Sequence, residues 1–358
     1  MATATPSTLF DVLNDPVCLV RLSPGAQTRI IRQARQAGLL GFIAAKIAPN
    51  QTSGKLADFL LSARVHADYH HRMITWEVDR LTRVMDCLTG PIILLKGAAY
   101  KALELDFSKG RLASDVDILL PREQLLQAER VLLDAGWEPM KQDQYEQHYY
   151  REWSHELPPL QHKERGTVVD LHHNILPSTA RAKPDADRLI NASRPMGDGR
   201  LFALCPVDSV LHRVAHLFFD GDLQNGLREL VDIHELIGAY SEGNSFWDDL
   251  VSRARELDLA RPLYYALYCC RSLLKTEIPE TVFRESQRHA PFTLLRQFMQ
   301  WLMARQLRPP ELDAREPLRS VSGWLLFLRS HWLRMPPLLL ARHLLTQIWR
   351  RGGIRVGS

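Results

Sequence analysis

The segment PIILLKGAAYKALELDFSKGRLASDVDILL, residues 91–120, contains two short apolar runs with a helix-compatible segment between them. The first run, Ile92–Leu95, ends at Lys96-Gly97, and the second, Asp115–Leu120, begins with two carboxylates. Short apolar runs that are bounded by glycine and charged residues are typical of buried strands. The segment therefore predicts two strands at the centre of an α/β or α+β core with a short mixed β-sheet.

The two acids of the second run, Asp115 and Asp117, lie two residues apart. Side chains alternate between the two faces of a strand, so both carboxylates are expected on one face. Two ionised carboxylates repel each other unless a cation lies between them, and this arrangement indicates oxygen-liganded Mg²⁺ or Mn²⁺. The alternative is a solvated strand start or a helix N-cap that binds no metal.

A third acid, Asp170, occurs in a similar setting within GTVVDLHH, residues 166–173. Three strand-borne carboxylates can hold two metal ions, which is the usual apparatus for in-line phosphoryl or nucleotidyl transfer. Lys96-Gly97 fits the same chemistry, because glycine allows the backbone to approach a phosphate and the lysine can neutralise its charge. We therefore expect the three aspartates, Asp115, Asp117 and Asp170, to form one site with Lys96-Gly97.

Two further residues are candidates for the site. His172 shares the face of Asp170 by the period of two, where it could contact a phosphate or orient a carboxylate, although a hydrogen-bonded structural histidine is an equal alternative. Arg111 precedes the Asp115 pair and could contact a phosphate, or it could form an ion pair with one of the two carboxylates.

Several motifs then occur in a characteristic order along the chain. They are Lys96-Gly97, Arg111, Ser114–Leu120, Val169–His172, His216-Leu217 and Leu227–Ile233. In this order they resemble the uncharacterised bacterial nucleotidyltransferase family of the DNA polymerase beta-type superfamily, over roughly residues 25 to 240. The last two motifs are similar to the helical segment that follows the catalytic sheet in that family.

The resemblance implies a fold and a reaction. Asp115 and Asp117 would be the metal-ligand pair, Asp170 the third carboxylate, and Gly97 part of the turn that faces the triphosphate of an NTP donor. The superfamily usually has Gly-Ser at this turn, whereas this chain has Lys96-Gly97-Ala98, so Lys96 and Arg111 are expected to hold the phosphates. The implied reaction moves an NMP group to a hydroxyl or phosphate acceptor and releases pyrophosphate.

The composition is that of a globular protein, with 358 residues, 46% apolar and 24% charged. A net charge of +4 gives no strong nucleic-acid signal, which leans toward a small molecule or a protein as the unknown acceptor. Five cysteines without metal-ligand spacing favour thiols in a reducing cytoplasm. Because the N-terminus lacks a signal pattern and no apolar run reaches about 18 residues, we expect a cytoplasmic protein without a transmembrane helix.

Patterns of helical spacing, turns and charge divide the chain into four predicted regions. These are an N-terminal helical region (1–90), the catalytic core (91–200), a helical domain (201–316) and a basic amphipathic tail (317–358). Within the core, the aromatic segment Tyr149–Trp153 and the segment His155–Gln161 are predicted to be extended.

The predicted tail contains seven arginines and no acid, with large apolar residues between them. Pro336-Pro337 divides it into two short amphipathic helices. Such a pattern can lie on an anionic membrane surface or bind a partner, which would make the protein peripheral to the membrane. The alternative is that its apolar faces pack on the helical domain while the arginines are solvated.

Two classes of function remain open from the sequence. One is a metal-dependent nucleotidyltransferase, and the other is a non-catalytic nucleotide-binding or scaffold protein that docks through its basic tail. The presence of all three carboxylates favours the enzyme. Loss of Mg²⁺-NTP binding in Asp115→Asn would distinguish the two, because a scaffold that acts through its tail would not need that carboxylate.

Overall fold

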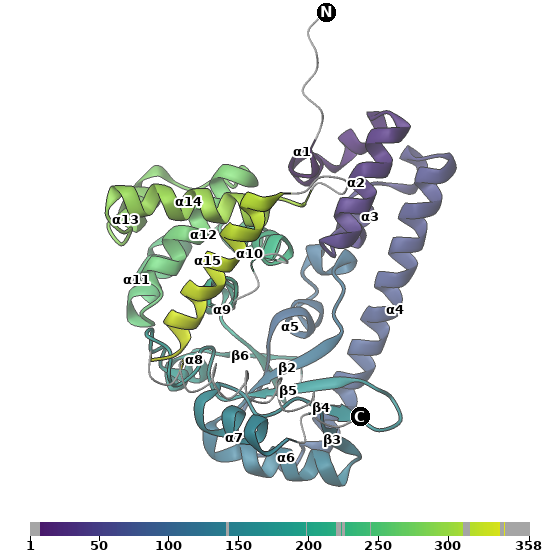
Figure 1. Cartoon of the computed structure of the whole chain (residues 1–358). Helices are drawn as coiled ribbons and strands as arrows, with labels where there is room; N and C mark the ends of the chain where they lie inside the picture. Colours follow the sequence, from purple (N-terminus) through teal and green to yellow (C-terminus); the bar gives the residue numbers. More distant parts are fainter. Residues whose placement is uncertain are drawn as a thin grey trace, which may run out of the picture.

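A mixed sheet lies at the centre of one half of the molecule, and helices surround it (Figure 1). The computed structural model describes residues 8–140, 143–197, 199–219, 223, 226–243, 245–310, 316–336 and 340. Within these residues the sheet has seven strands in the order β3-β4-β5-β2-β1-β7-β6. The prediction of a mixed sheet with a mostly helical C-terminal part is confirmed.

The strands are short, and the two longest lie side by side. Their bounds are β1 Ile92–Leu94, β2 Asp115–Leu119, β3 Trp137–Pro139, β4 Leu160–His162, β5 Val168–His172, β6 Arg194–Met196 and β7 Leu201–Ala203. The β2·β5 and β1·β7 pairs are parallel, and the other pairs are antiparallel. Burial of Val116, Ile118 and Leu171 explains why β2 and β5 form the centre of the sheet.

The N-terminal region is helical, as predicted, and its longest helix runs beside the sheet (Figure 1). The helices are α1 Leu9–Asn14, α2 Pro24–Gln36, α3 Leu40–Lys46 and α4 Gly54–Val84, with 3-10 turns η1 Pro16–Arg21 and η2 Pro49–Gln51. Helix α4 also fixes the loop before β2. The ring nitrogens of His70 and His71 lie 3.1 Å from the carbonyl oxygens of Ala113 and Arg111, respectively.

The helices of the core connect its strands. They are α5 Lys96–Ala102 and the 3-10 helix η3 Asp106–Gly110 after β1, η4 Arg122–Gln124 and α6 Leu125–Asp134 after β2, α7 Gln144–Trp153 after β3 and α8 Ala186–Asn191 before β6. The prediction that Tyr149–Trp153 is extended is wrong, because this segment belongs to α7. Its aromatic residues favour a strand by propensity, but Tyr149 and Trp153 are one helical turn apart and their rings contact each other.

Helices make up most of the rest of the described chain, which agrees with the predicted mostly helical C-terminal part. They are α9 Pro206–Phe219, α10 Gly226–Tyr240, α11 Phe246–Glu256, α12 Ala260–Leu273, α13 Glu280–Gln287, α14 Thr293–Leu307 and α15 Pro317–Arg334. Helix α15 is the first predicted tail helix; the second falls on residues 337–339 and 341–358, outside the described residues. Over the described residues, no helix is long and apolar enough to cross a bilayer.

Two glycines allow the N-terminal helices to approach the core closely. A Cβ atom added to Gly41 in α3 would lie 2.4 Å from the carbonyl oxygen of Gly110, which ends η3. A Cβ atom on Gly110 would meet the carbonyl oxygen of Gly41 at 2.2 Å. Neither position has room for a side chain, so this contact helps to hold the loop that leads into β2.

We expect Gly41→Ala to lower the free energy of unfolding by about 1–3 kcal/mol, because the added methyl group overpacks this contact. Gly238 is the matched control, since it also lies within a helix but has nothing within 4 Å of an added Cβ atom. Gly238→Ala should raise the free energy of unfolding by about 0.5–1 kcal/mol through helix propensity. Urea unfolding measures both changes, and equal effects would contradict the close packing.

Candidate active site

The face that β2 and β5 share carries the predicted carboxylates. In the parallel register Asp117 lies opposite Asp170. The ligand atoms of Asp117, Asp170 and His172 all lie within 4.8 Å of one another. Asp115, at the first position of β2, is not a member of this close group, and its Oδ1 atom lies 3.4 Å from the hydroxyl of Ser114. The structure thus brings Asp117, Asp170 and His172 together and leaves Asp115 outside this close group.

Lys96 is the cation of the site. It begins α5 with a backbone φ of 46°, in the left-handed region, and its ammonium donates to Oδ1 of Asp117 at 2.7 Å. Burial disfavours the charge of Lys96, but Asp117 outweighs burial and raises the pKa of the amine. Burial alone would raise the pKa of Asp117, yet Lys96 and His172 hold it well below its usual range. Asp117 is therefore an anion in the folded protein.

His172 orients a carboxylate, which is one of the two roles considered from the sequence. Its Nε2 lies 3.1 Å from Oδ1 of Asp117, and its Nδ1 lies 3.3 Å from Oε2 of Glu156. Burial disfavours the imidazolium, but the hydrogen bond to Asp117 and the charge of Glu156 raise the pKa of His172. Glu156 was not predicted, because the single β-bridge that pairs it with His172 leaves no mark in the sequence.

Asp170 lacks a cationic partner of this kind. Its Oδ1 atom is buried without a hydrogen-bond partner. Burial, followed by the charges of Asp117 and Glu156, raises the pKa of Asp170 to about 7. A buried carboxylate that is held next to another anion is stabilised when a divalent cation binds between them. The oxygen-rich donor set of the site therefore fits a hard ion such as Mg²⁺ or Mn²⁺.

The guanidinium of Arg111 lies behind the Lys96-Gly97 turn. Its Nε donates to both carboxylate oxygens of Asp232 in α10, at 2.8 and 2.9 Å. The alternative that Arg111 pairs with Asp115 or Asp117 is thus wrong. Gly97 is close to it, because a Cβ atom there would lie 2.7 Å from Nη1 of Arg111. Glycine at this position allows the turn to pack directly on the arginine.

Further charged residues surround this pair, and several of them belong to the segments His216-Leu217 and Leu227–Ile233. Arg213 of α9 is 1% exposed, and its Nη2 lies 3.0 Å from Oδ2 of Asp232. Nδ1 of His216 lies 2.9 Å from Oε2 of Glu229. Arg228 is also close, since Arg111 adds to burial in lowering its pKa. The three arginines Arg111, Arg213 and Arg228 thus lie close to only two carboxylates, those of Asp232 and Glu229. The region next to the Lys96-Gly97 turn therefore has an excess of positive charge.

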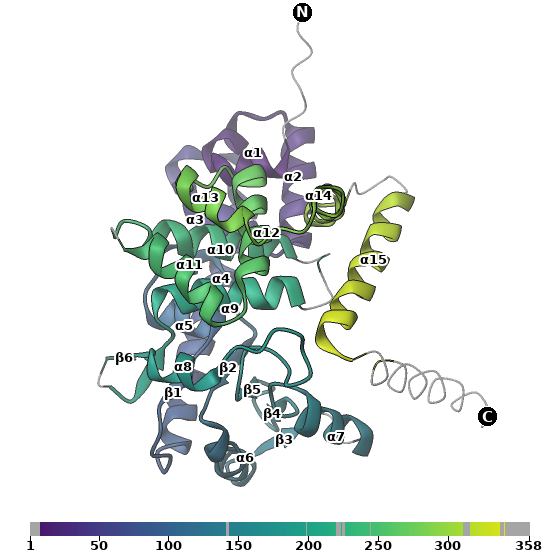
Figure 2. The same cartoon turned by 90° about the vertical axis from the view of Figure 1, so that its left-hand side faces the viewer.

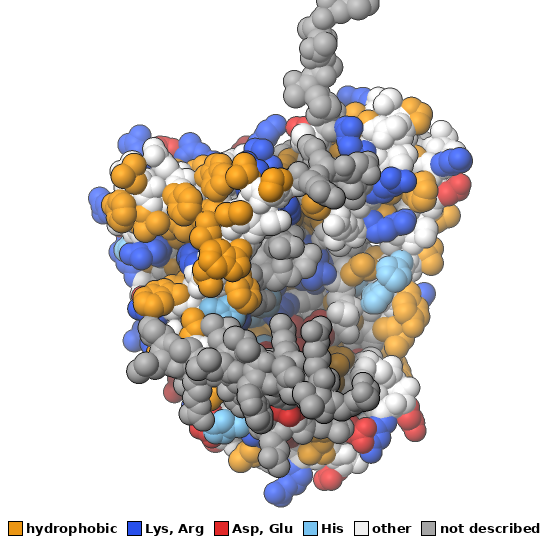
Figure 3. Space-filling model, in the orientation of Figure 1, with side chains coloured by type: hydrophobic (Ala, Val, Ile, Leu, Met, Phe, Trp, Pro, Cys, Tyr) orange, Lys and Arg blue, Asp and Glu red, His pale blue; other side chains and the backbone are white. Residues whose placement is uncertain are grey.

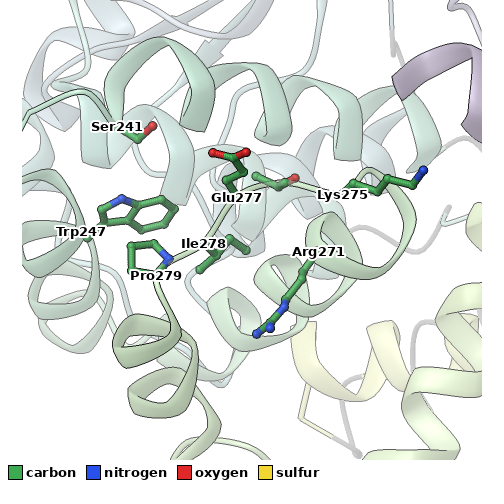
Figure 4. Close-up of a pocket in the computed structure, with 8 residues that line it drawn as sticks. Ser241, Trp247, Arg271, Lys275, Glu277, Ile278 and Pro279 are labelled. Carbon is green, nitrogen blue, oxygen red and sulfur yellow. The ribbon is translucent and has the colours of Figure 1, made fainter. Parts of the chain in front are cut away.

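Two hollows lie away from the carboxylates. One of about 690 Å³ is lined by Ser241, which follows α10, by residues of α11 and α12, and by the segment before α13, among them Trp247, Lys275 and Glu277 (Figure 4). The other, of about 1000 Å³, lies between α4 and α5 and includes His71 and Lys101. Asp115, Asp117 and Asp170 line neither of them.

Comparison with known families identifies the family of the chain. The model of a family described as uncharacterised nucleotidyltransferase matches residues 23–275, which is more than half of the chain and includes β2, β5 and the turn at Lys96. Among curated proteins and solved structures, none matches this chain. The matched range also includes α9 and α10, which carry Arg213 and Asp232. The chain therefore belongs to this family of nucleotidyltransferases.

Proposed function

We propose that this protein transfers an NMP group from an NTP to an acceptor hydroxyl or phosphate and releases pyrophosphate. The observation that carries the proposal is the pair Asp117 and Asp170, which lie opposite each other on β2 and β5, with a buried oxygen of Asp170 left without a hydrogen-bond partner. Such a pair suits divalent-cation chemistry on phosphates.

Asp115, Asp117 and Asp170 would hold the metal. Mg²⁺ or Mn²⁺ bound there would supply Lewis-acid activation of the acceptor oxygen and charge neutralisation at the phosphates. His172 contributes by fixing the orientation of Asp117, to which it is hydrogen-bonded. In this assignment His172 acts through the carboxylate rather than on the nucleotide itself.

The triphosphate would bind at the Lys96-Gly97 turn. Lys96 supplies a cation at Asp117, and Arg111 supplies a second one directly behind Gly97. Arg213 and Arg228 add positive charge without taking up carboxylates of the metal site. The positive charge of Lys96 and these arginines favours the binding of an anionic ligand at the Lys96-Gly97 turn. The acceptor would be a small molecule or a protein.

The direct test is pyrophosphate release from each of the four NTPs with Mg²⁺ or Mn²⁺, comparing wild type with the double variant Asp115→Asn, Asp117→Asn. We expect turnover in the wild type and a loss of at least about 1000-fold in the variant, because two metal ligands are removed. Circular dichroism checks that the variant is folded. If wild type binds no Mg²⁺-NTP and releases no pyrophosphate, the scaffold alternative replaces the enzyme.

A further inference from the structure

One surface of the molecule is apolar and largely exposed, and of its members Trp332 is contacted by Arg181, whose guanidinium carbon lies 4.3 Å from the centre of the ring. It is formed by Leu294, Phe298 and Trp301 of α14 together with Leu318, Trp324 and Trp332 of α15, which we call the aromatic face. Its most exposed members are Leu294 at 75% and Trp324 at 60%. Figure 3 shows hydrophobic side chains gathered over these two helices.

The inner sides of the same helices are already packed. Met303 and Leu326 are buried, and Gln306 of α14 donates to the hydroxyl of Ser322 in α15 at 2.7 Å. Arg329 also donates to the carbonyl oxygen of Phe218 in α9. A surface helix normally has a polar outer side, so apolar residues on both sides of α15 indicate a binding partner.

The charge of the two helices is one-sided. Helix α14 contains two arginines, α15 contains three, and neither contains an aspartate or glutamate. The exposed Arg308 follows α14 directly. The absence of acids extends over residues 317–358, which carry seven arginines. The aromatic face is therefore an apolar surface in a positive electrostatic environment.

These charges decide between the candidate partners. A second copy of this chain would bring two such faces together, with arginines in excess on both sides and Glu316 as the one acid among the described residues of α14, α15 and their ends. An anionic bilayer offers the opposite charge, and tryptophan and phenylalanine favour its interface. Helix α15 also lies at the outer edge of the molecule (Figure 2).

We propose that the aromatic face binds the surface of an anionic phospholipid bilayer. The tryptophan, phenylalanine and leucine side chains enter the interface, while the exposed Arg308 lies among the headgroups. The binding is peripheral, since α15, with 18 residues, does not meet the hydropathy required of a spanning helix. It does not depend on nucleotidyl transfer, because none of the residues involved contacts the carboxylate site.

Co-sedimentation of the full chain with POPC vesicles and with POPC/POPG vesicles tests this proposal. We expect binding to the POPG-containing vesicles only, and weaker binding as the ionic strength rises. The double variant Leu318→Ser, Trp324→Ser should bind at least about tenfold more weakly, because it removes two apolar side chains that enter the interface. Arg308→Gln should weaken binding to a smaller extent.

The matched control is Leu61→Ser, Leu126→Ser, which removes two equally exposed leucines, 57% and 70% exposed, from α4 and α6. It should leave vesicle binding unchanged. Thermal unfolding confirms that all variants are folded. The proposal is overturned if wild type does not bind POPC/POPG vesicles, or if Leu318→Ser, Trp324→Ser binds them as tightly as wild type. It is also overturned if both double variants lose binding equally. A dimer that dissociates in the face variant, without vesicle binding, would instead assign the face to a second copy.

Discussion

Asp170→Asn is expected to lower nucleotidyl transfer by at least about 1000-fold and yet to make the protein more stable at pH 8. The loss of activity follows from removing the carboxylate that faces Asp117 across β2 and β5. The gain in stability follows because Asp170 is buried next to like charges, which raise its pKa to about 7. A neutral amide at this position avoids that repulsion.

The pH dependence of this gain in stability follows from the pKa of Asp170. Its value in the folded protein, about 7, exceeds the ordinary value of 3.8, so the folded state binds the proton more tightly than the unfolded state. The stabilising contribution is thus fully present below about pH 4 and is lost as the pH rises through about 7. Asp170→Asn should therefore raise the free energy of unfolding by about 2–3 kcal/mol more at pH 8 than at pH 5, and it should have little effect only below about pH 4.

Urea unfolding at the two pH values measures this difference. Glu138→Gln is the control in the same sheet, because the Glu138 side chain is 54% exposed and forms only a surface ion pair with Lys163. It should change stability by less than about 0.5 kcal/mol at either pH. An Asp170→Asn variant that is as active as wild type, or that is less stable at pH 8, would contradict the role assigned to this carboxylate.

Asp232→Asn is expected to have the largest effect on stability, a loss of about 3–5 kcal/mol. Asp232 is 2% exposed, and its carboxylate forms ion pairs with both Arg111 and Arg213. Its replacement by an amide leaves two buried guanidinium groups without their common counter-charge. Because Arg111 also supports Gly97, the change should weaken nucleotide binding in any protein that remains folded.

Equilibrium urea unfolding measures the loss. Asp79→Asn is the matched control, because Asp79 also pairs with an arginine, Arg83, but at the surface, where its side chain is 53% exposed. The control should change stability by less than about 0.5 kcal/mol. Similar losses in the two variants would show that the buried cluster is not held together by Asp232.

The sequence predicted those parts of the molecule that depend on local patterns. The apolar runs before Lys96 and after Asp115 correspond to β1 and β2, because burial on both faces of the sheet requires such runs. The run around Asp170 corresponds to β5 for the same reason. The period of two predicted that His172 shares the face of Asp170, because this rule needs no knowledge of the tertiary fold. In the structure Nε2 of His172 lies 3.1 Å from Oδ1 of Asp117 on the neighbouring strand.

Long-range contacts could not be predicted in this way. The partner of Arg111 is 121 residues away in α10, and Glu156 reaches His172 from an irregular segment. Arg213 is one of several polar residues of α9, and only the packing of α9 against α10 shows that it is buried. The helix α7 was missed because aromatic side chains that favour strands in general pack against one another along a helix here.

We propose that the carboxylates of β2 and β5 hold the divalent ions that bind the phosphates of an NTP. Titration of Mn²⁺ followed by EPR, with and without a non-hydrolysable NTP analogue, tests it without knowledge of the acceptor. We predict that wild type binds Mn²⁺ more tightly in the presence of the analogue, and that Asp115→Asn and Asp170→Asn each weaken this binding by at least about tenfold. Mn²⁺ binding of equal affinity in wild type and both variants, or none in any of them, would contradict the claim.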